Sequence, residues 1–317
     1  MSHIRHLNHG YNLIIPKPLK RGDLVAVVAT SGPVEEANLN HGLEFLNGLG
    51  LSVVVGSNAI RNLGYLAGSD SERCMDLNAM LRNPDVRGIF FARGGYGVMR
   101  LLDSLDCGAL QRDPKLLLGM SDITALQLSL FARLRLVTLS GPMIAGQLSR
   151  GLDALTEEWF VKSLMHPLAG RDLVPPVPNG LKVVRHGRGE GQLVGGCLSM
   201  VAALMGTPHA PDFTNTVLLL EDVHEPLYRL DRLMTQLKLS GVLDRLAGLL
   251  IGHIIGPKGR NLREEFEALV LDVTSGTGYP ILSGVPHGHA LTNLTLPHGV
   301  PVELKTDPPC VRTRATV

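Results

Sequence analysis

The chain has 317 residues, a length that predicts about two domains at ~150 residues each. Hydrophobic residues make up 44% and charged residues 19%, which are ordinary globular values and exclude wholesale disorder, and a net charge of +1 gives no general reason to bind nucleic acid or an anionic membrane. No apolar window is long enough for a spanning helix, and the first twenty residues lack the apolar core of a secretory signal. We therefore expect a cytoplasmic protein.

The first half of the chain alternates short apolar runs with helical patterns. Strands are predicted at residues 24–29, 51–55, 88–92, 116–118 and 136–139. Helices are predicted between them, on the spacing of Leu39, Leu43 and Leu46, after the capping box Ser69–Glu72, over 98–105, and on the spacing of Ile123, Leu126 and Leu130. Apolar runs without polar alternation are typical of strands covered on both faces. The pattern predicts a parallel α/β sheet.

A Pro- and Gly-rich stretch then separates the two halves. We expect an N-terminal α/β domain over 1–150, a linker over 151–190 and a C-terminal domain over 191–317. In the second half, helices are predicted at 198–205, 227–246 and 262–273, and strands at 217–220 and 249–255. The last forty residues are expected to be β-rich, with turns at 286–288 and 297–299.

The four cysteines do not indicate a disulfide framework. Cys74, Cys107, Cys197 and Cys310 are far apart, and no Cys-x-x-Cys pair occurs. We expect four reduced and mostly buried thiols.

Two Gly-containing turns follow predicted strands and so belong at the same edge of the sheet. In Gly119-Met120-Ser121-Asp122-Ile123, Ser121 stands between a strand and a helix, where free backbone N–H groups suit an oxyanion, although either Ser121 or Asp122 could be only a helix cap. In Arg93-Gly94-Gly95-Tyr96-Gly97, the glycines either let backbone amides approach a ligand or form a turn that serves packing only. Neither a dinucleotide fingerprint nor a Walker lysine is present.

An acid and a histidine later in the chain complete a possible catalytic set. Glu221 and Asp222 follow a predicted strand, with Glu225 and Asp231 as further candidates. His287 and His289 lie in a Gly/Pro-rich turn and either could act as a base. No third ligand accompanies them at a recognisable spacing, so no metal is expected. The order Ser, Glu, His occurs in one known arrangement of hydrolytic triads.

The chain resembles the LD-carboxypeptidases, a serine peptidase family that also includes the microcin C immunity proteins. The resemblance covers about 290 residues, from Leu19 to near the C-terminus. Its motifs are Gly22-Asp23, Ala29-Thr30-Ser31-Gly32-Pro33, Tyr65 to Asp70 with Arg73, Arg93 to Gly97, Gly119 to Thr124, Gly141-Pro142, Gly195 to Leu198, Gly206-Thr207-Pro208, Leu220-Glu221-Asp222, and Gly288-His289 with Asn293, Leu296, Pro297 and Gly299. Met120 and Cys197 depart from the aromatic residue and the asparagine expected there.

The resemblance implies a site and a fold. Ser121 would be the nucleophile, His289 the base and Glu221 its orienting acid, with the N–H groups of Gly95 and Asp122 as the oxyanion hole. The implied fold is a Rossmann-like or flavodoxin-like N-terminal domain with a smaller mixed α/β, β-rich C-terminal domain, and family members are often homodimers. No cofactor is implied, and Arg93 and Arg100 are unsupported candidates for holding the substrate carboxylate.

The implied reaction is removal of the terminal D-Ala from the murein tetrapeptide at the bond to meso-diaminopimelate, in cytoplasmic peptidoglycan recycling. One alternative is an amidase of the microcin C immunity type, which acts on peptidyl or aminoacyl nucleotides and stacks the base on an aromatic loop. The single tryptophan, Trp159, lies in a helical-looking segment and does not favour it. A minor alternative is a ligand-binding protein without catalysis.

Overall fold

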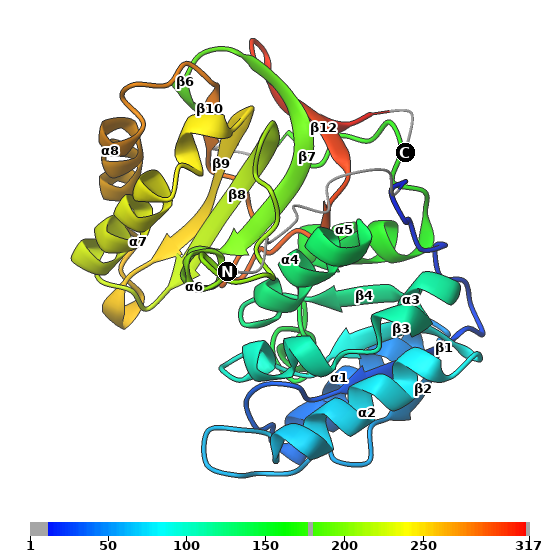
Figure 1. The fold of residues 1–317 in the computed structure, drawn as a ribbon. Coiled ribbons are helices and arrows are strands. Elements are labelled where there is room, and N and C mark those ends of the chain that lie inside the picture. Colours follow the sequence, from blue (N-terminus) through cyan, green and yellow to red (C-terminus); the bar gives the residue numbers. More distant parts are fainter. Residues whose placement is uncertain (1–11, 177–179, 315–317) are drawn as a thin grey trace.

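The computed structural model describes residues 12–176 and 180–314. These residues form two sheets with helices packed around them (Figure 1). Adjacent residues on one strand enter different cores: Leu218 and Leu220 pack in one cluster, whereas Val217 and Leu219 pack in another. Both faces of the strand are therefore buried, which is why these runs lack polar alternation.

The first sheet has the strand order β11-β5-β4-β3-β1-β2. Its members are β1 (Leu24–Val28), β2 (Ser52–Val55), β3 (Val86–Phe91), β4 (Leu116–Gly119), β5 (Thr138–Ser140) and β11 (Leu296–His298), and β1 to β5 pair in parallel. The helical segments between them are α1 (Glu36–Gly48), α2 (Asp70–Arg82), the 3₁₀ turn η1 (Val98–Ser104), α3 (Cys107–Arg112) and α4 (Ile123–Leu134). α4 lies between the two sheets and is almost wholly buried (Figure 1).

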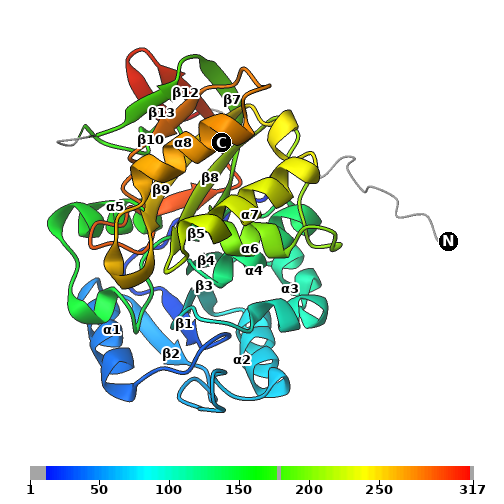
Figure 2. The same ribbon diagram turned by 90° about the vertical axis from the view of Figure 1, so that its left-hand side faces the viewer.

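The second sheet has the strand order β13-β12-β7-β8-β9-β10-β6. Its members are β6 (Lys182–Arg185), β7 (Arg188–Cys197), β8 (Thr216–Val223), β9 (Gly248–Ile255), β10 (Ile281–Ser283), β12 (Pro301–Thr306) and β13 (Pro309–Thr313). The strands β7 to β10 are parallel, and the outer pairings are antiparallel. Helices α6 (Leu198–Ala203), α7 (Leu227–Leu239) and α8 (Arg263–Val273) cover one face (Figure 2), with short 3₁₀ turns at Leu243–Arg245 and Pro257–Gly259.

Several connections tie the halves together. After the 3₁₀ turn η2 (Leu148–Arg150), α5 (Ala154–Met165) brings Trp159 into a core on one face of the second sheet, where it clusters with Val217 and Leu219 of β8. β11, from the second half of the chain, pairs with β5 of the first sheet, and β6, from the stretch expected to be a linker, pairs with β10. The chain therefore crosses between the sheets more than once. None of the helices in the described residues has the length and apolar character that a membrane crossing requires.

The expected parallel α/β pattern of the first half is confirmed, including the capping box of Ser69 and Glu72. Three details differ. The helix expected over 227–246 ends at Leu239, because Gly241 adopts a φ of +72° and reverses the chain. The turn expected at 297–299 is in part strand β11, because β5 pairs with it. All four cysteines are free, but only Cys197 is buried, so the expectation of mostly buried thiols is wrong.

Candidate functional site

Ser121 occupies a strained turn between β4 and α4. Its φ is +62°, a left-handed conformation that is uncommon for a residue with a side chain. The side chain packs against Gly94, where an added Cβ would lie 2.7 Å from Ser121 Cβ and 2.8 Å from its Oγ. Only glycine at position 94 allows this approach. The turn therefore presents a half-buried hydroxyl at the N-terminus of a twelve-residue helix, beside the Gly-rich loop.

The Gly-rich loop at residues 93–97 is shaped by close backbone contacts. Gly95 has a φ of +111°, and a Cβ there would lie 3.3 Å from the Cα and N of Gly32. Gly95 is exposed, whereas Gly94 and Gly97 are buried. Its backbone is thus open to a ligand on the side that solvent reaches, which is what an N–H donor to an oxyanion requires.

The Asp122 side chain holds this loop in place. Its carboxylate is buried and accepts hydrogen bonds from Val98 N at 2.8 Å and from Ser31 Oγ at 2.6 Å. Burial raises the pKa of Asp122, although both hydrogen bonds favour the charged form. The buried guanidinium of Arg73 donates to Gly97 O at 3.0 Å. The family resemblance implied a role for the backbone N–H of Asp122. The hydrogen bonds of its side chain were not foreseen, because their donors lie 24 and 91 positions away.

Glu221 and His289 form a direct pair at the edge of the second sheet. Glu221 lies near the end of β8 with its residue 1% exposed, and its Oε2 lies 2.7 Å from His289 Nδ1. The contact depends on Gly288, which has a φ of +121° and where a Cβ would lie 2.6 Å from Glu221 Oε2. Among residues 12–176 and 180–314, the Nε2 atom of His289 has no hydrogen-bond partner.

The pair shifts the titration of both groups. Burial by itself would raise the pKa of Glu221, but the His289 charge and hydrogen bond lower it below its usual value. Burial would lower the pKa of His289, but the Glu221 carboxylate raises it. The arrangement therefore stabilises an imidazolium beside a carboxylate, as a base that accepts a proton requires.

The other acidic candidates have different partners. Asp222 is buried and accepts hydrogen bonds from Ser199 N at 2.8 Å and Ser199 Oγ at 2.6 Å. It therefore caps the N-terminus of α6 and does not orient a histidine. Burial raises the pKa of Asp222 to about 6, and the neighbouring Glu221 charge adds to the rise. Glu225 pairs with Arg229 at 3.0 Å, and Asp231 accepts from Thr235 Oγ1 on the surface of α7.

The two histidines of the 286–289 turn occupy different environments. His287 is wholly buried, with Nδ1 2.8 Å from Leu294 O and Nε2 3.2 Å from Ser140 Oγ. Burial lowers its pKa. His289 has a side chain that is 22% exposed and faces Glu221. Both ring nitrogens of His287 therefore have hydrogen-bond partners, whereas His289 has a partner only at Nδ1 among the described residues.

A hydrogen bond links the helix that follows Ser121 to the strand beside Glu221. Thr124 Oγ1, on α4, accepts from Cys197 N at 3.2 Å, and Cys197 is the register partner of Glu221 between β7 and β8. No hydrogen bond joins Ser121 Oγ to His289 in the described part of the chain. Such contacts are often long in enzymes without substrate and tighten on binding.

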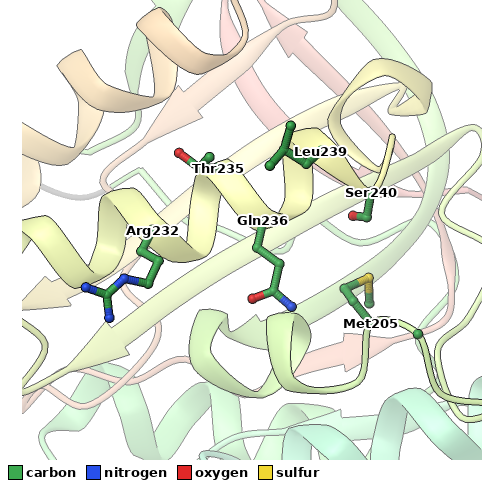
Figure 3. Close-up of a pocket in the computed structure, with 7 residues that line it drawn as sticks. Met205, Arg232, Thr235, Gln236, Leu239 and Ser240 are labelled. Atoms are coloured by element: carbon green, nitrogen blue, oxygen red, sulfur yellow. The ribbon is translucent and has the colours of Figure 1, made fainter.

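Further candidates are placed as follows. Arg100 pairs with Asp70 at 2.8 Å, whereas Arg93 is exposed and donates to Pro33 O at 2.6 Å. The described residues contain no group of three or more metal-binding side chains. A surface cavity of about 510 Å³ lies between α7 and the turn that follows α6 (Figure 3), lined by Met205, Gly206, Arg232, Thr235, Gln236, Leu239 and Ser240. None of the candidate catalytic residues lines it.

Comparison with known proteins places the chain in a family. Residues 25–141 match the LD-carboxypeptidase N-terminal domain, and residues 190–304 match the LD-carboxypeptidase C-terminal domain. A putative carboxypeptidase of Streptomyces coelicolor is 41% identical, over 93% of this chain and 94% of the relative.

Two solved structures share the architecture. The muramoyltetrapeptide carboxypeptidase of Oxalobacter formigenes is 31% identical, with a TM-score of 0.78 over 91% of this chain and 97% of that one. A structure of the microcin C7 self-immunity protein MccF is 26% identical, with a TM-score of 0.88 over 96% of this chain and 98% of that one. The MccF sequence of Escherichia coli is 28% identical over 93% of this chain and 94% of that protein. The mixed α/β fold with two sheets is the fold of these proteins. The chain belongs to the LD-carboxypeptidase family, and it is a carboxypeptidase-type hydrolase.

Proposed function

We propose that Ser121, His289 and Glu221 form the catalytic triad of this hydrolase. The observation that carries the proposal is the 2.7 Å contact of Glu221 Oε2 with His289 Nδ1, which leaves Nε2 free to accept a proton. A serine hydroxyl is a weak nucleophile until a base takes its proton. The strained turn that exposes Ser121, and its position beside Gly94, support the nucleophile's role.

We further propose that the substrate is the murein tetrapeptide that ends in meso-diaminopimelate-D-Ala. Ser121 Oγ attacks the carbonyl carbon of the diaminopimelate residue, and its proton passes to His289 Nε2. His289 then protonates the leaving amine, so D-Ala departs and an acyl-enzyme remains. Water, deprotonated by His289, attacks the acyl carbon; His289 then returns this proton to Ser121 Oγ as the ester bond breaks and the tripeptide leaves. Membership of the LD-carboxypeptidase family and the muramoyltetrapeptide carboxypeptidase among the relatives support this substrate.

The backbone N–H groups of Gly95 and Asp122 are the proposed oxyanion hole. Both groups lie near the Ser121 side chain. Gly95 is the residue after Gly94, which packs against that side chain, and Asp122 is the residue after Ser121, at the start of α4. The helix dipole adds partial positive charge at this point. Donors of this kind each contribute about 10²–10³-fold to turnover in serine peptidases.

One observation favours the second candidate, an amidase acting on aminoacyl nucleotides. Tyr65 and Tyr96 are 66% and 51% exposed, and their rings meet edge to face at 5.6 Å beside Gly95. Exposed aromatic rings are a stacking surface for a base. Trp159 supplies no such surface, because it is buried and its Nε1 donates to Leu173 O at 3.0 Å.

The test combines a substitution with a substrate panel. Ser121→Ala should fold and lose about 10⁴–10⁶-fold in kcat. Wild type should release D-Ala from the tetrapeptide, and little from a pentapeptide ending D-Ala-D-Ala or a tetrapeptide ending in L-Ala. Hydrolysis of an aminoacyl-sulfamoyl adenosine, with all three peptides inert, would establish the second candidate instead. The triad would be refuted if Ser121→Ala kept more than a tenth of wild-type activity, or if the wild-type protein hydrolysed none of these substrates.

The family resemblance is also the basis for proposing a cytoplasmic homodimer that uses neither metal nor cofactor. Light scattering coupled to size-exclusion chromatography measures the oligomeric state, and a mass of one chain would refute the dimer. Fractionation of the source cells, with the protein found outside the cytoplasm, would refute the location.

A further inference from the structure

The catalytic groups proposed above come from different sheets, so their separation depends on contacts between the two sheets. Ser121 follows β4 of the first sheet, whereas Glu221 lies on β8 of the second sheet and His289 on the loop after β10. A shift of about 1 Å between a nucleophile and its base can cost ~10²-fold in rate. A buried side chain hydrogen-bonds to the residue before Ser121 and to the residue before His289.

That side chain is Asn293, which is wholly buried. Its Oδ1 accepts from Gly288 N, next to His289, at 3.0 Å. Its Nδ2 donates to the sulfur of Met120, next to Ser121, at 3.1 Å, and to Gln147 Oε1 at 2.8 Å. An amide has one acceptor oxygen and two N–H donors, so this orientation uses each polar group of Asn293, and the reversed orientation would not.

The amide of Gln147 extends the connection along the histidine loop. Gln147 Nε2 donates to Ala290 O at 2.7 Å, on the other side of His289 from Gly288. The two amides together therefore hold the residues before and after His289. The backbone of Asn293 is itself fixed, because its N–H donates to Thr156 Oγ1 at 2.9 Å.

We propose that Asn293 is a positioning residue that sets the separation of Ser121 and His289, with Gln147 as its partner. The inference rests on the proposed triad. In the part of the chain that the structure describes, Asn293 forms no hydrogen bond with Ser121, Glu221 or His289, so it acts on distance and leaves the basicity of His289 unchanged. Its loss should lower the rate of every step that needs proton transfer between Ser121 and His289.

The experiment compares Asn293→Ala and Gln147→Ala with Asn58→Ala as a matched control. Asn58 is also a buried asparagine whose side chain donates hydrogen bonds, to Asp76 Oδ1 and Glu72 O. It follows β2, which is separated from β4 by β1 and β3. Two rates are measured on active-site-titrated enzyme: the rate of Ser121 labelling by a small fluorophosphonate, and kcat and KM for the tetrapeptide. The melting temperature gives the structural cost.

For Asn293→Ala we expect labelling and kcat to fall about 10²-fold, with KM changed less than about threefold. For Gln147→Ala, at a half-buried position that tolerates truncation better, the labelling rate and kcat should fall about tenfold. The acidic limb of the pH profile should stay in place, because Glu221 still faces His289. Asn58→Ala should lower the melting temperature similarly and keep labelling within about threefold of wild type.

Three results would overturn the proposal: labelling of folded Asn293→Ala within threefold of wild type, an equal slowing in Asn58→Ala, or a shifted acidic limb. Where Asn293→Ala does not fold, Gln147→Ala decides by the same criteria. Failure of the triad itself is distinguishable, because the fluorophosphonate would then leave Ser121 of the wild-type enzyme unlabelled while the peptide is still hydrolysed.

Discussion

Replacing Glu221 by glutamine removes the charge that orients His289 and changes few atoms. The carboxylate is buried beside Gly288, and its Oε2 accepts from Nδ1 at 2.7 Å. An amide that presents its N–H to Nδ1 selects the wrong tautomer and leaves Nε2 protonated. The comparable change in a serine peptidase triad costs ~10⁴-fold. We expect Glu221→Gln to lose about 10³–10⁴-fold in kcat, equivalent to about 4–5.5 kcal/mol of transition-state stabilisation.

The same substitution has a second signature in the pH profile. In the wild type, His289 must be neutral to accept a proton, so kcat/KM rises with pH through its pKa, which Glu221 raises. Without the carboxylate, burial remains and lowers the pKa of His289. The acidic limb of Glu221→Gln should therefore move to lower pH even as the plateau falls. Steady-state kinetics on the tetrapeptide across the acidic range measures both effects.

Asp222→Asn is the matched control for this prediction. Asp222 accepts hydrogen bonds from Ser199 and from Val223 N at 2.7 Å, and an asparagine oxygen keeps part of this set. We expect a stability loss of about 1–3 kcal/mol and less than about tenfold loss of kcat. Equal kinetic damage from Glu221→Gln and Asp222→Asn, or an unmoved acidic limb in Glu221→Gln, would refute the assignment of Glu221 as the orienting acid.

Three further predictions follow from particular contacts. Gly288→Ala should lower kcat at least tenfold, because the new Cβ would lie 2.6 Å from Glu221 Oε2 and displace it. The control Gly241→Ala, at φ +72° with no atom within 4 Å of the new Cβ, should lose only about 1–3 kcal/mol of unfolding free energy to backbone strain and keep its kcat. Equal values of kcat for the two variants would contradict this prediction. His298 is buried with neither nitrogen paired among the described residues, and burial lowers its pKa from 6.5 to about 3, so its stabilising contribution is complete above pH 6.5 and is lost as pH falls towards 3. Between pH 7 and pH 4, the free energy of unfolding measured in urea should fall about 3 kcal/mol less for His298→Leu than for the wild type. An equal fall in both proteins would show that His298 takes up its proton in the folded state as readily as in the unfolded one. EDTA should leave turnover unchanged, since the described residues hold no cluster of three metal-binding side chains, and activity restored by zinc after chelation would reverse this reading.

Local patterns in the sequence were sufficient for much of the first domain's secondary structure. The run Leu24–Val28 and the capping box at Ser69 and Glu72 depend on neighbours within a few residues, so the order of residues determines them. The sequence also placed the serine turn and the Gly-rich loop at the same edge of a sheet, because parallel strands end together. The family could be identified from motifs in order along the chain.

Other features depended on contacts between distant segments, which no local pattern contains. Glu221 and His289 are 68 positions apart, and only the packed turn shows that His289 keeps a free nitrogen while His287 has both nitrogens occupied. The pairing of β11 with β5, which carries a segment of the second half into the first sheet, was likewise invisible in a three-residue run. Asn293 and Met120 are 173 positions apart. The sequence determined which chemical groups were available, whereas burial and hydrogen bonding across the two sheets decided which of them meet, because desolvation and donor geometry exist only once the chain is packed.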